Sequence, residues 1–75
     1  MIILVLNCGS SSIKYQLVDM QGETKILAKG LIERIGISDG ILTHKPAGKE
    51  VYKVVTDIPD HTIGINMLME ALLHP

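Results

Sequence analysis

The sequence predicts an α/β fold in which a β-meander of about five strands is followed by one helix. Short apolar or alternating runs are separated by turn-forming segments, as in strands joined by hairpins. Toward the C-terminus, the apolar residues instead recur at helical spacing. The 75 residues are 47% hydrophobic, but their only aromatics are two tyrosines. The core is therefore expected to consist of Ile, Leu, Val and Met side chains.

The first two predicted strands differ in their pattern. Ile2–Leu6 is apolar at every position, which is typical of a strand covered on both faces. Asn7–Ser11 then supplies small, turn-forming residues. From Ser12 onward polar and apolar residues alternate, which predicts a strand with one apolar face. Its apolar face consists of Ile13, Tyr15 and Leu17, and its polar face of Ser12, Lys14 and Gln16.

The next strands follow the same logic. Asp19–Gly22 supplies a turn, and Lys25–Glu33 resumes the alternation of a strand. Beyond a loop at Gly36–Gly40 we expect a hairpin, because two short runs are separated by a hairpin-sized connection. The hairpin strands are Ile41–Lys45 and Val51–Val55, joined around Pro46-Ala47-Gly48.

A helix is predicted after the strands. Pro59 closes the strand region, and Asp60 is suited to be the helix N-cap. Leu68 and Leu72 then fall on one helical stripe. The apolar residues within 63–69 also alternate as in a strand, and Gly64 weakens a helix by ~1 kcal/mol. We predict the helix and keep the strand as the alternative.

The balance of hydrophobic surface predicts that residues 1–75 are an N-terminal fragment of a larger protein, whose remainder is not in this sequence. Five strands and one helix would cover the apolar strand Ile2–Leu6 on one side at best. The mean hydropathy of +0.33 is also high for so short a chain. The missing cover is expected to come from further elements.

Charge and cysteine content exclude several classes. Seven basic and eight acidic side chains give a net charge of −1, which argues against nucleic-acid binding and against a polybasic membrane anchor. Cys8 is the only cysteine, so an internal disulfide and a zinc site of paired cysteines are excluded. The apolar run at the start is far shorter than the ~20 residues of a membrane helix and lacks the features of a signal peptide. A cytoplasmic protein is expected.

Chemistry is expected in the turn within Asn7–Lys14. Gly9 lacks a Cβ, so backbone can approach a ligand closely there. Successive backbone N–H groups and the serine hydroxyls can surround an anion. Lys14 lies two residues after Ser12, which predicts that both share a strand face and that the ammonium acts on a bound phosphate. Asn7 offers an amide oxygen that could hold a hydrated Mg²⁺.

The same residues also fit an ordinary hairpin turn, in which Lys14 is a solvated charge and Asn7 a turn residue. The pattern is not the Walker motif, where a Lys directly precedes Ser or Thr at the start of a helix. It is not the dinucleotide fingerprint either, because that motif needs more glycines and a following helix. The spacing alone leaves phosphate binding and a plain turn open.

The run Leu6–Leu17, Leu-Asn-Cys-Gly-Ser-Ser-Ser-Ile-Lys-Tyr-Gln-Leu, resembles the N-terminal signature of acetate kinases. That family belongs to the superfamily of sugar kinases, actin and heat-shock chaperone ATPases, which implies an actin-like ATPase (ribonuclease H-like) domain. Glu33–Gly36 and Asp57–His61 are similar to the family as well, so the resemblance covers most of the chain. Cys8 stands where relatives commonly carry Ala or Ser, and this keeps the side chain small.

The resemblance implies an enzyme, a phosphotransferase with a carboxyl group as acceptor. Acetate kinases transfer phosphate reversibly between ATP and acetate, with Mg²⁺, and give acetyl phosphate and ADP. By this resemblance ATP is bound by Lys14, Ser12, Ser10 and Gly9, and the metal is held by Asn7 directly or through a water. The expected partners are acetate and ATP, with no nucleic acid and no membrane. Relatives are two-domain homodimers that close over their substrates.

The main catalytic residues are expected beyond Pro75, since the family supplies the charge around the transferring phosphoryl group mostly from arginines and a histidine later in its sequence. The 75-residue segment alone is therefore expected to be inactive. Arg34 is expected to be solvated or structural. The three histidines are expected to be surface or capping residues: His44, His61 and His74.

Alternatives to an acetate kinase remain open. The chain could belong to a propionate kinase or to another short-chain carboxylate kinase, although the three serines favour the acetate or propionate branch by resemblance. It could be a non-catalytic phosphate-binding module that kept the turn. It could also be a purely structural β-domain, in which the serine turn is incidental.

Overall fold

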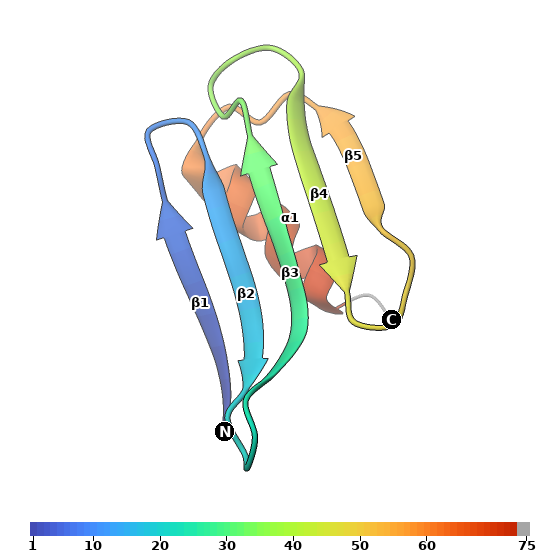
Figure 1. The fold of residues 1–75 in the computed structure, drawn as a ribbon. Coiled ribbons are helices and arrows are strands. Elements are labelled where there is room, and N and C mark those ends of the chain that lie inside the picture. The colour runs from blue at the N-terminus through green and yellow to red at the C-terminus, as the bar shows by residue number, and fades with distance from the viewer. Residues whose placement is uncertain (74–75) are drawn as a thin grey trace.

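A computed structural model describes residues 1–73 as one antiparallel sheet with a helix on one face (Figure 1). The sheet order follows the chain, β1-β2-β3-β4-β5, so every strand pairs with its sequence neighbour. The elements are β1 (Ile2–Cys8), β2 (Ile13–Asp19), β3 (Lys25–Glu33), β4 (Gly40–Pro46), β5 (Tyr52–Thr56) and α1 (His61–Leu73). The predicted meander and helix are confirmed, with ends shifted by only a few residues.

The alternation in β2 determines which side chains reach the core. Ile13 and Tyr15 are buried under α1, whereas Lys14 between them is exposed. Residues opposite each other in neighbouring strands share a face, so the pairing carries this division across the sheet. Ile13 lies opposite Ile32 of β3, and Ile32 lies opposite Leu42 of β4. Together they form a continuous apolar surface for the helix.

The core lies between this surface and α1. It consists of Ile13, Tyr15, Ile32, Ile35, Leu42, Ile58, Leu68 and Ala71. Burying an aliphatic side chain of this size contributes roughly 1.5–3 kcal/mol relative to leaving it exposed. Aliphatic residues supply most of the core, as the composition predicts. Only Tyr15 adds an aromatic ring to it.

Local features explain why residues 61–73 form a helix despite Gly64. The N–H of Ile63 donates to Oδ1 of Asp60 at 2.9 Å, which confirms Asp60 as the N-cap. Gly64 is buried, and a Cβ there would come within 3.3 Å of Cδ1 of Ile13. The glycine therefore lowers helix propensity but lets the first turn of α1 lie close to β2.

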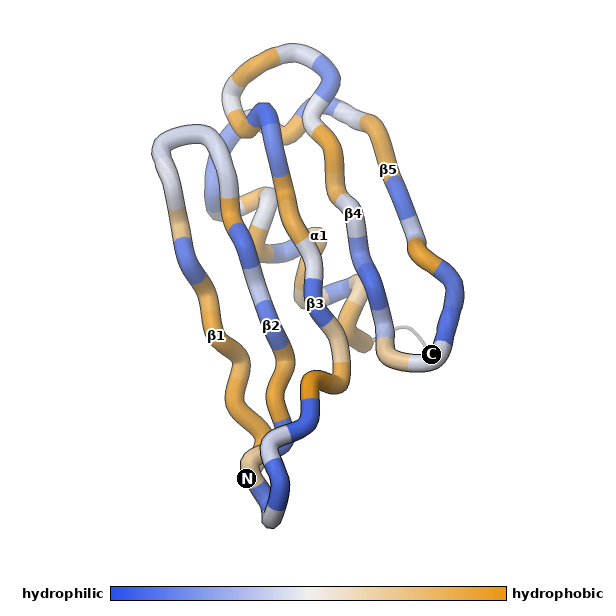
Figure 2. The backbone as a smooth tube through the Cα atoms, viewed as in Figure 1, coloured by the Kyte–Doolittle hydropathy of each residue, from blue (hydrophilic) through white to orange (hydrophobic). Residues whose placement is uncertain are grey.

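β1 is the strand that the described residues cover least, as expected for a segment of only five strands and one helix. Within residues 1–73 it is an edge strand that pairs only with β2. Figure 2 shows that it is apolar over most of its length. Ile2 is 63% exposed and Val5 48% exposed. Residues 1–73 thus leave β1 largely uncovered, because α1 packs mainly over β2, β3 and β4. An apolar edge strand of this kind is a surface that soluble domains normally cover.

A buried polar pair crosses the middle of the sheet. Tyr15 of β2 lies opposite Gly30 of β3, and Gly30 lies opposite His44 of β4. The Tyr15 hydroxyl forms a hydrogen bond with Nδ1 of His44 over a distance of 2.5 Å, so the ring spans the intervening strand. His44 is only 5% exposed. The prediction of a surface or capping role for His44 is therefore wrong, because Tyr15 supplies the partner that a buried imidazole needs.

Candidate phosphate-binding turn

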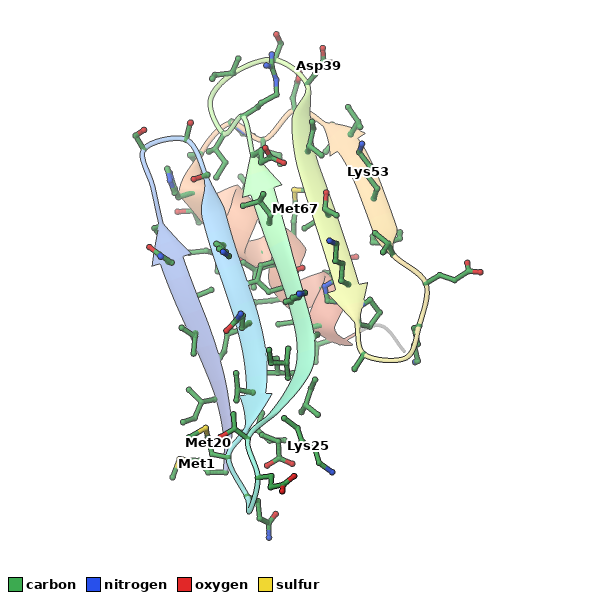
Figure 3. All side chains as sticks on the ribbon, viewed as in Figure 1. Met1, Met20, Lys25, Asp39, Lys53 and Met67 are labelled. Atoms are coloured by element: carbon green, nitrogen blue, oxygen red, sulfur yellow. The ribbon has the colours of Figure 1, made fainter. Side chains whose placement is uncertain are left out.

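The predicted turn connects β1 to β2 and consists of residues 9–12. It lies at the same end of the sheet as the loop between β3 and β4 and the start of α1 (Figure 1). The other end of the β1–β2 pair is closed by the Met20 N–H, which donates to the Met1 carbonyl at 2.8 Å. Figure 3 shows Met1 and Met20 together there. The turn is thus the tip of a ladder that is paired along its full length.

Three hydrogen bonds hold the carbonyls of the turn. The Gly9 N–H donates to the Ser12 carbonyl at 2.8 Å. The Ile35 N–H, from the loop after β3, donates to the Ser11 carbonyl at 3.0 Å. Nε2 of His61, the first residue of α1, donates to the Gly9 carbonyl at 2.7 Å. The negative ends of these peptide dipoles are therefore already paired with protein donors.

In the described part of the chain, the N–H groups of the three serines in the turn, in contrast to these paired carbonyls, have no backbone partner. Within residues 1–73, the N–H groups of Ser10, Ser11 and Ser12 donate no hydrogen bond to another backbone group. Successive unpaired amides in a turn form a concavity that attracts anions. The serine hydroxyls at the same positions add donors that rotate to suit an oxygen. This arrangement can receive a phosphate.

Asn7 and Lys14 are brought together beside the turn. They lie directly opposite each other in β1 and β2, so their side chains share a face. Both are exposed, and neither takes part in any side-chain hydrogen bond of residues 1–73. This face is the one opposite α1, because Ile13 and Tyr15 point to the helix. An ammonium and an amide oxygen are therefore available together at the base of the turn.

Ser12 is the last residue of the turn, directly before β2 begins at Ile13. Its carbonyl accepts the hydrogen bond from the Gly9 N–H, so the two residues lie opposite each other. A Cβ at Gly9 would come within 2.8 Å of Oγ of Ser12. The backbone of Gly9 does not adopt positive φ. The glycine is therefore suited to its position because it leaves room for the Ser12 hydroxyl.

Metal binding would have to rest on few protein ligands. Within residues 1–73, no group of three or more His, Cys, Asp or Glu side chains could hold a metal ion. An exposed amide oxygen such as that of Asn7 fits a cation that keeps most of its water and shares phosphate oxygens, as Mg²⁺ does. The residues at the turn fit a nucleotide-bound Mg²⁺ and not a metal held mainly by protein.

The other residues singled out in the sequence lie outside this cluster or fall into structural roles. Arg34 is exposed, and its Nε donates to the Ser38 carbonyl at 3.0 Å within its own loop. His74 lies outside the described residues. His61 is the residue that sequence reasoning missed, since it contacts the turn. One feature of the sequence pointed to it: a histidine at the first helical position is not favoured by the helix dipole, so a contact elsewhere can explain its presence there.

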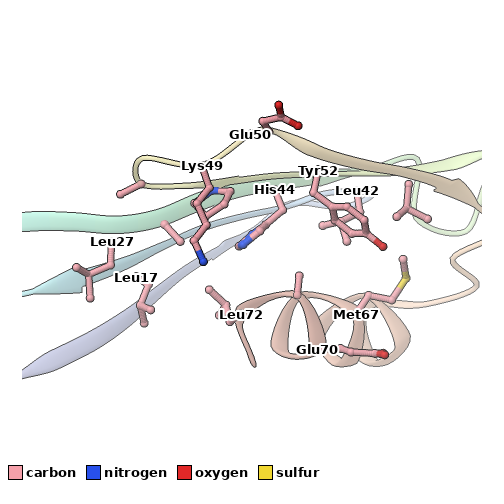
Figure 4. A pocket seen from close by; sticks show the side chains of 15 residues that line it. Leu17, Leu27, Leu42, His44, Lys49, Glu50, Tyr52, Met67, Glu70 and Leu72 are labelled. Atoms are coloured by element: carbon pink, nitrogen blue, oxygen red, sulfur yellow. The ribbon is translucent and has the colours of Figure 1, made fainter. Parts of the chain in front are cut away.

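A separate groove of about 850 Å³ lies between the C-terminal half of α1 and the β4–β5 hairpin (Figure 4). Leu42, Val54 and Leu72 form part of its wall, and His44 and Lys49 also line it. The groove is far along α1 from His61 and contains none of the turn residues. It is not part of the candidate site. In the part of the chain that the structure describes, no helix is long and apolar enough to cross a membrane.

The architecture matches a solved structure, the crystal structure of Porphyromonas gingivalis acetate kinase. The two superpose with a TM-score of 0.87 at 36% sequence identity, over 97% of this chain and 18% of that chain. The fold is therefore the N-terminal part of an actin-like ATPase domain, a five-stranded antiparallel sheet followed by a helix.

Sequence comparison identifies the family. The sequence profile of the Acetokinase family matches residues 2–75, so the chain belongs to this family. Acetate kinase of Moorella thermoacetica is 62% identical over 73 residues, which are 97% of this chain and 18% of that protein. Acetate kinase of Desulfitobacterium hafniense (strain Y51) is 55% identical over 73 residues, again 97% of this chain and 18% of the relative. The chain thus spans about 18% of the length of these relatives.

Proposed function

We propose that this chain is the N-terminal portion of the nucleotide-binding domain of an acetate kinase. The enzyme would transfer phosphate reversibly between ATP and acetate and release acetyl phosphate and ADP. Similarity to proteins named acetate kinase, at 62% and 55% identity, supports this activity over that of a propionate kinase. The proposal also includes a cytoplasmic homodimer, as in the family that the sequence resembles.

One observation carries the proposed role of residues 1–75. The amides of Ser10, Ser11 and Ser12 have no backbone partner within the described residues, and the Asn7–Lys14 pair lies beside them. An ordinary two-residue hairpin turn would pair the Ser12 N–H with the Gly9 carbonyl, and here that bond is absent. A turn that keeps them unpaired next to a free ammonium is suited to a chain of phosphates.

Each residue has a distinct role in the proposed site. The amides and hydroxyls of Ser10 and Ser12 would hold phosphate oxygens of ATP, and Gly9 would leave room for Oγ of Ser12. Lys14 would neutralise phosphate charge as a point charge. Asn7 would hold Mg²⁺ through its amide oxygen, directly or through a water. When bound, the ion supplies positive charge that offsets the charge of the phosphates.

These roles amount to binding and orientation. Phosphoryl transfer depends mostly on positioning and on electrostatic stabilisation of the transferring group. Arg34, the one arginine of residues 1–73, is engaged in its own loop and does not supply such charge at the turn. We therefore propose that the rest of the enzyme supplies the catalytic residues and that residues 1–75 alone are inactive.

The test is Lys14→Ala in the full-length enzyme that carries this segment. A hydrogen bond to a charged group contributes about 1.5–3 kcal/mol, so the KM for ATP should rise about tenfold or more. The KM for acetate should stay within about twofold, because Lys14 does not reach the acyl group in this proposal. Lys25→Ala is the matched control, an exposed lysine on β3 that pairs with Asp19 at the opposite end of the sheet from the turn. Equal increases in both KM values, or no effect on either, would contradict the proposed role.

A further inference from the structure

His61 makes a contact with the turn that nothing in the proposed binding roles uses. Its Nε2 lies 2.7 Å from the Gly9 carbonyl oxygen, across 52 residues of sequence. A carbonyl oxygen only accepts hydrogen bonds, so Nε2 must carry a hydrogen. The imidazole is therefore present either as the Nε2–H tautomer or as the cation, and in both forms it donates to Gly9.

This contact replaces a hydrogen bond that a closed hairpin would contain. Gly9 and Ser12 face each other across the turn, and a hydrogen-bonded pair in an antiparallel ladder exchanges two N–H···O bonds. Here only one of the two is present, from the Gly9 N–H to the Ser12 carbonyl. The Gly9 carbonyl is bonded to His61 in place of the Ser12 N–H. The Ser12 amide thereby joins those of Ser10 and Ser11 as an unpaired donor.

The structure holds His61 firmly at this position. Asp60 caps α1 through the Ile63 N–H at 2.9 Å, so the first helical turn is well defined. One turn along, Gly64 lies against Ile13, the residue that follows Ser12. The helix start is thus docked on the strand that leaves the turn. His61 is partly exposed, so its placement comes from the helix and not from burial of the ring.

We propose that His61 is a positioning residue for nucleotide phosphate. By holding the Gly9 carbonyl, it keeps the turn open and leaves the Ser12 N–H free for a phosphate oxygen. Without this donor, the Gly9 carbonyl and the Ser12 amide would pair with each other, and one anion-binding amide would be lost. The inference rests on the proposed function, because it assumes that the turn binds ATP.

The experiment compares variants of the full-length enzyme carrying this segment. His61→Ala should raise the KM for ATP about fivefold to tenfold, as expected for one lost hydrogen bond to a positioned group, and leave the KM for acetate within about twofold. His61→Gln should restore most of the affinity, because its side-chain amide can donate from nearly the same place. Thr62→Ala, an exposed neighbour in α1, should leave both constants unchanged.

A second pair of His61 variants controls for a loss of folding. His61→Leu and His61→Gln have side chains of similar size, but only glutamine can donate. A KM for ATP that is the same in both would overturn the inference, as would a parallel rise in the KM values for ATP and acetate. Lys14→Ala distinguishes a failure of the proposed role of His61 from a failure of the proposed phosphate site. If it raises the KM for ATP while His61→Leu does not, only the role of His61 fails. If Lys14→Ala has no effect, the phosphate site itself fails.

Discussion

Replacing Gly30 with alanine should destabilise the sheet more than a usual surface substitution does. A Cβ on Gly30 would overlap Cζ and the hydroxyl oxygen of Tyr15, whose ring lies across β3 at this point. The ring cannot move aside without leaving His44, its hydrogen-bond partner in β4. Two costs therefore add up. Overpacking a core costs about 1–3 kcal/mol, and a buried polar group left without its partner costs about 1–3 kcal/mol.

The expected loss is thus about 3 kcal/mol or more in the free energy of unfolding, a large part of the stability of a typical domain. Denaturant unfolding of the full-length enzyme, followed by circular dichroism, measures it. A double-mutant cycle with Tyr15→Ala is the control. In that background the ring is absent, so Gly30→Ala should cost less than about 1 kcal/mol. Equal costs of Gly30→Ala in both backgrounds would refute the reasoning, because the cost would then not arise from Tyr15.

Three further predictions concern the stability at low pH, the stability at high pH and the helix start. Burial lowers the pKa of His44 below its ordinary value of 6.5 and raises the pKa of Tyr15 to about 12. Below pH 6.5 the His44 imidazole binds a proton more readily in the unfolded chain than in the folded protein, so the melting temperature should fall as the pH is lowered. His44→Leu should remove this pH dependence. Above pH 10 Tyr15 ionises more readily in the unfolded chain than in the folded protein, so stability should fall between pH 10 and 12. Tyr15→Phe should remove this loss of stability at high pH. An unchanged loss in the variant would show that Tyr15 is not its cause. Asp60→Ala should cost about 1 kcal/mol through loss of the N-cap, whereas Asp60→Asn should cost less, both measured by thermal melting.

The order of the elements was predictable because it depends on local patterns. Alternation in residues 12–17 and 25–33 indicates strands with one buried face, and β2 and β3 are found there. The cap at Asp60 could likewise be read from its place before the apolar helical stripe. The lower helix propensity caused by Gly64 is also a local effect that could be predicted. The close contact of Gly64 with Ile13, which offsets this cost, could not be predicted because Ile13 lies in a strand far away in the sequence.

The features that were missed all depend on register and tertiary contact. His44 is buried because three strands align Tyr15, Gly30 and His44 in one row, and no local pattern contains that alignment. The Gly9–His61 contact joins residues 52 positions apart. At the candidate site, the turn and the Asn7–Lys14 pairing could be inferred from a single hairpin. The diversion of the Gly9 carbonyl to α1 could not.

The most direct test of the account is a structure of the full-length enzyme, carrying this segment, with a non-hydrolysable ATP analogue and Mg²⁺. We expect phosphate oxygens within about 3 Å of the amide nitrogens of Ser10 and Ser12, the usual length of such hydrogen bonds, with the Lys14 ammonium beside them. A triphosphate anchored elsewhere, with the turn between β1 and β2 free of phosphate, would contradict the account.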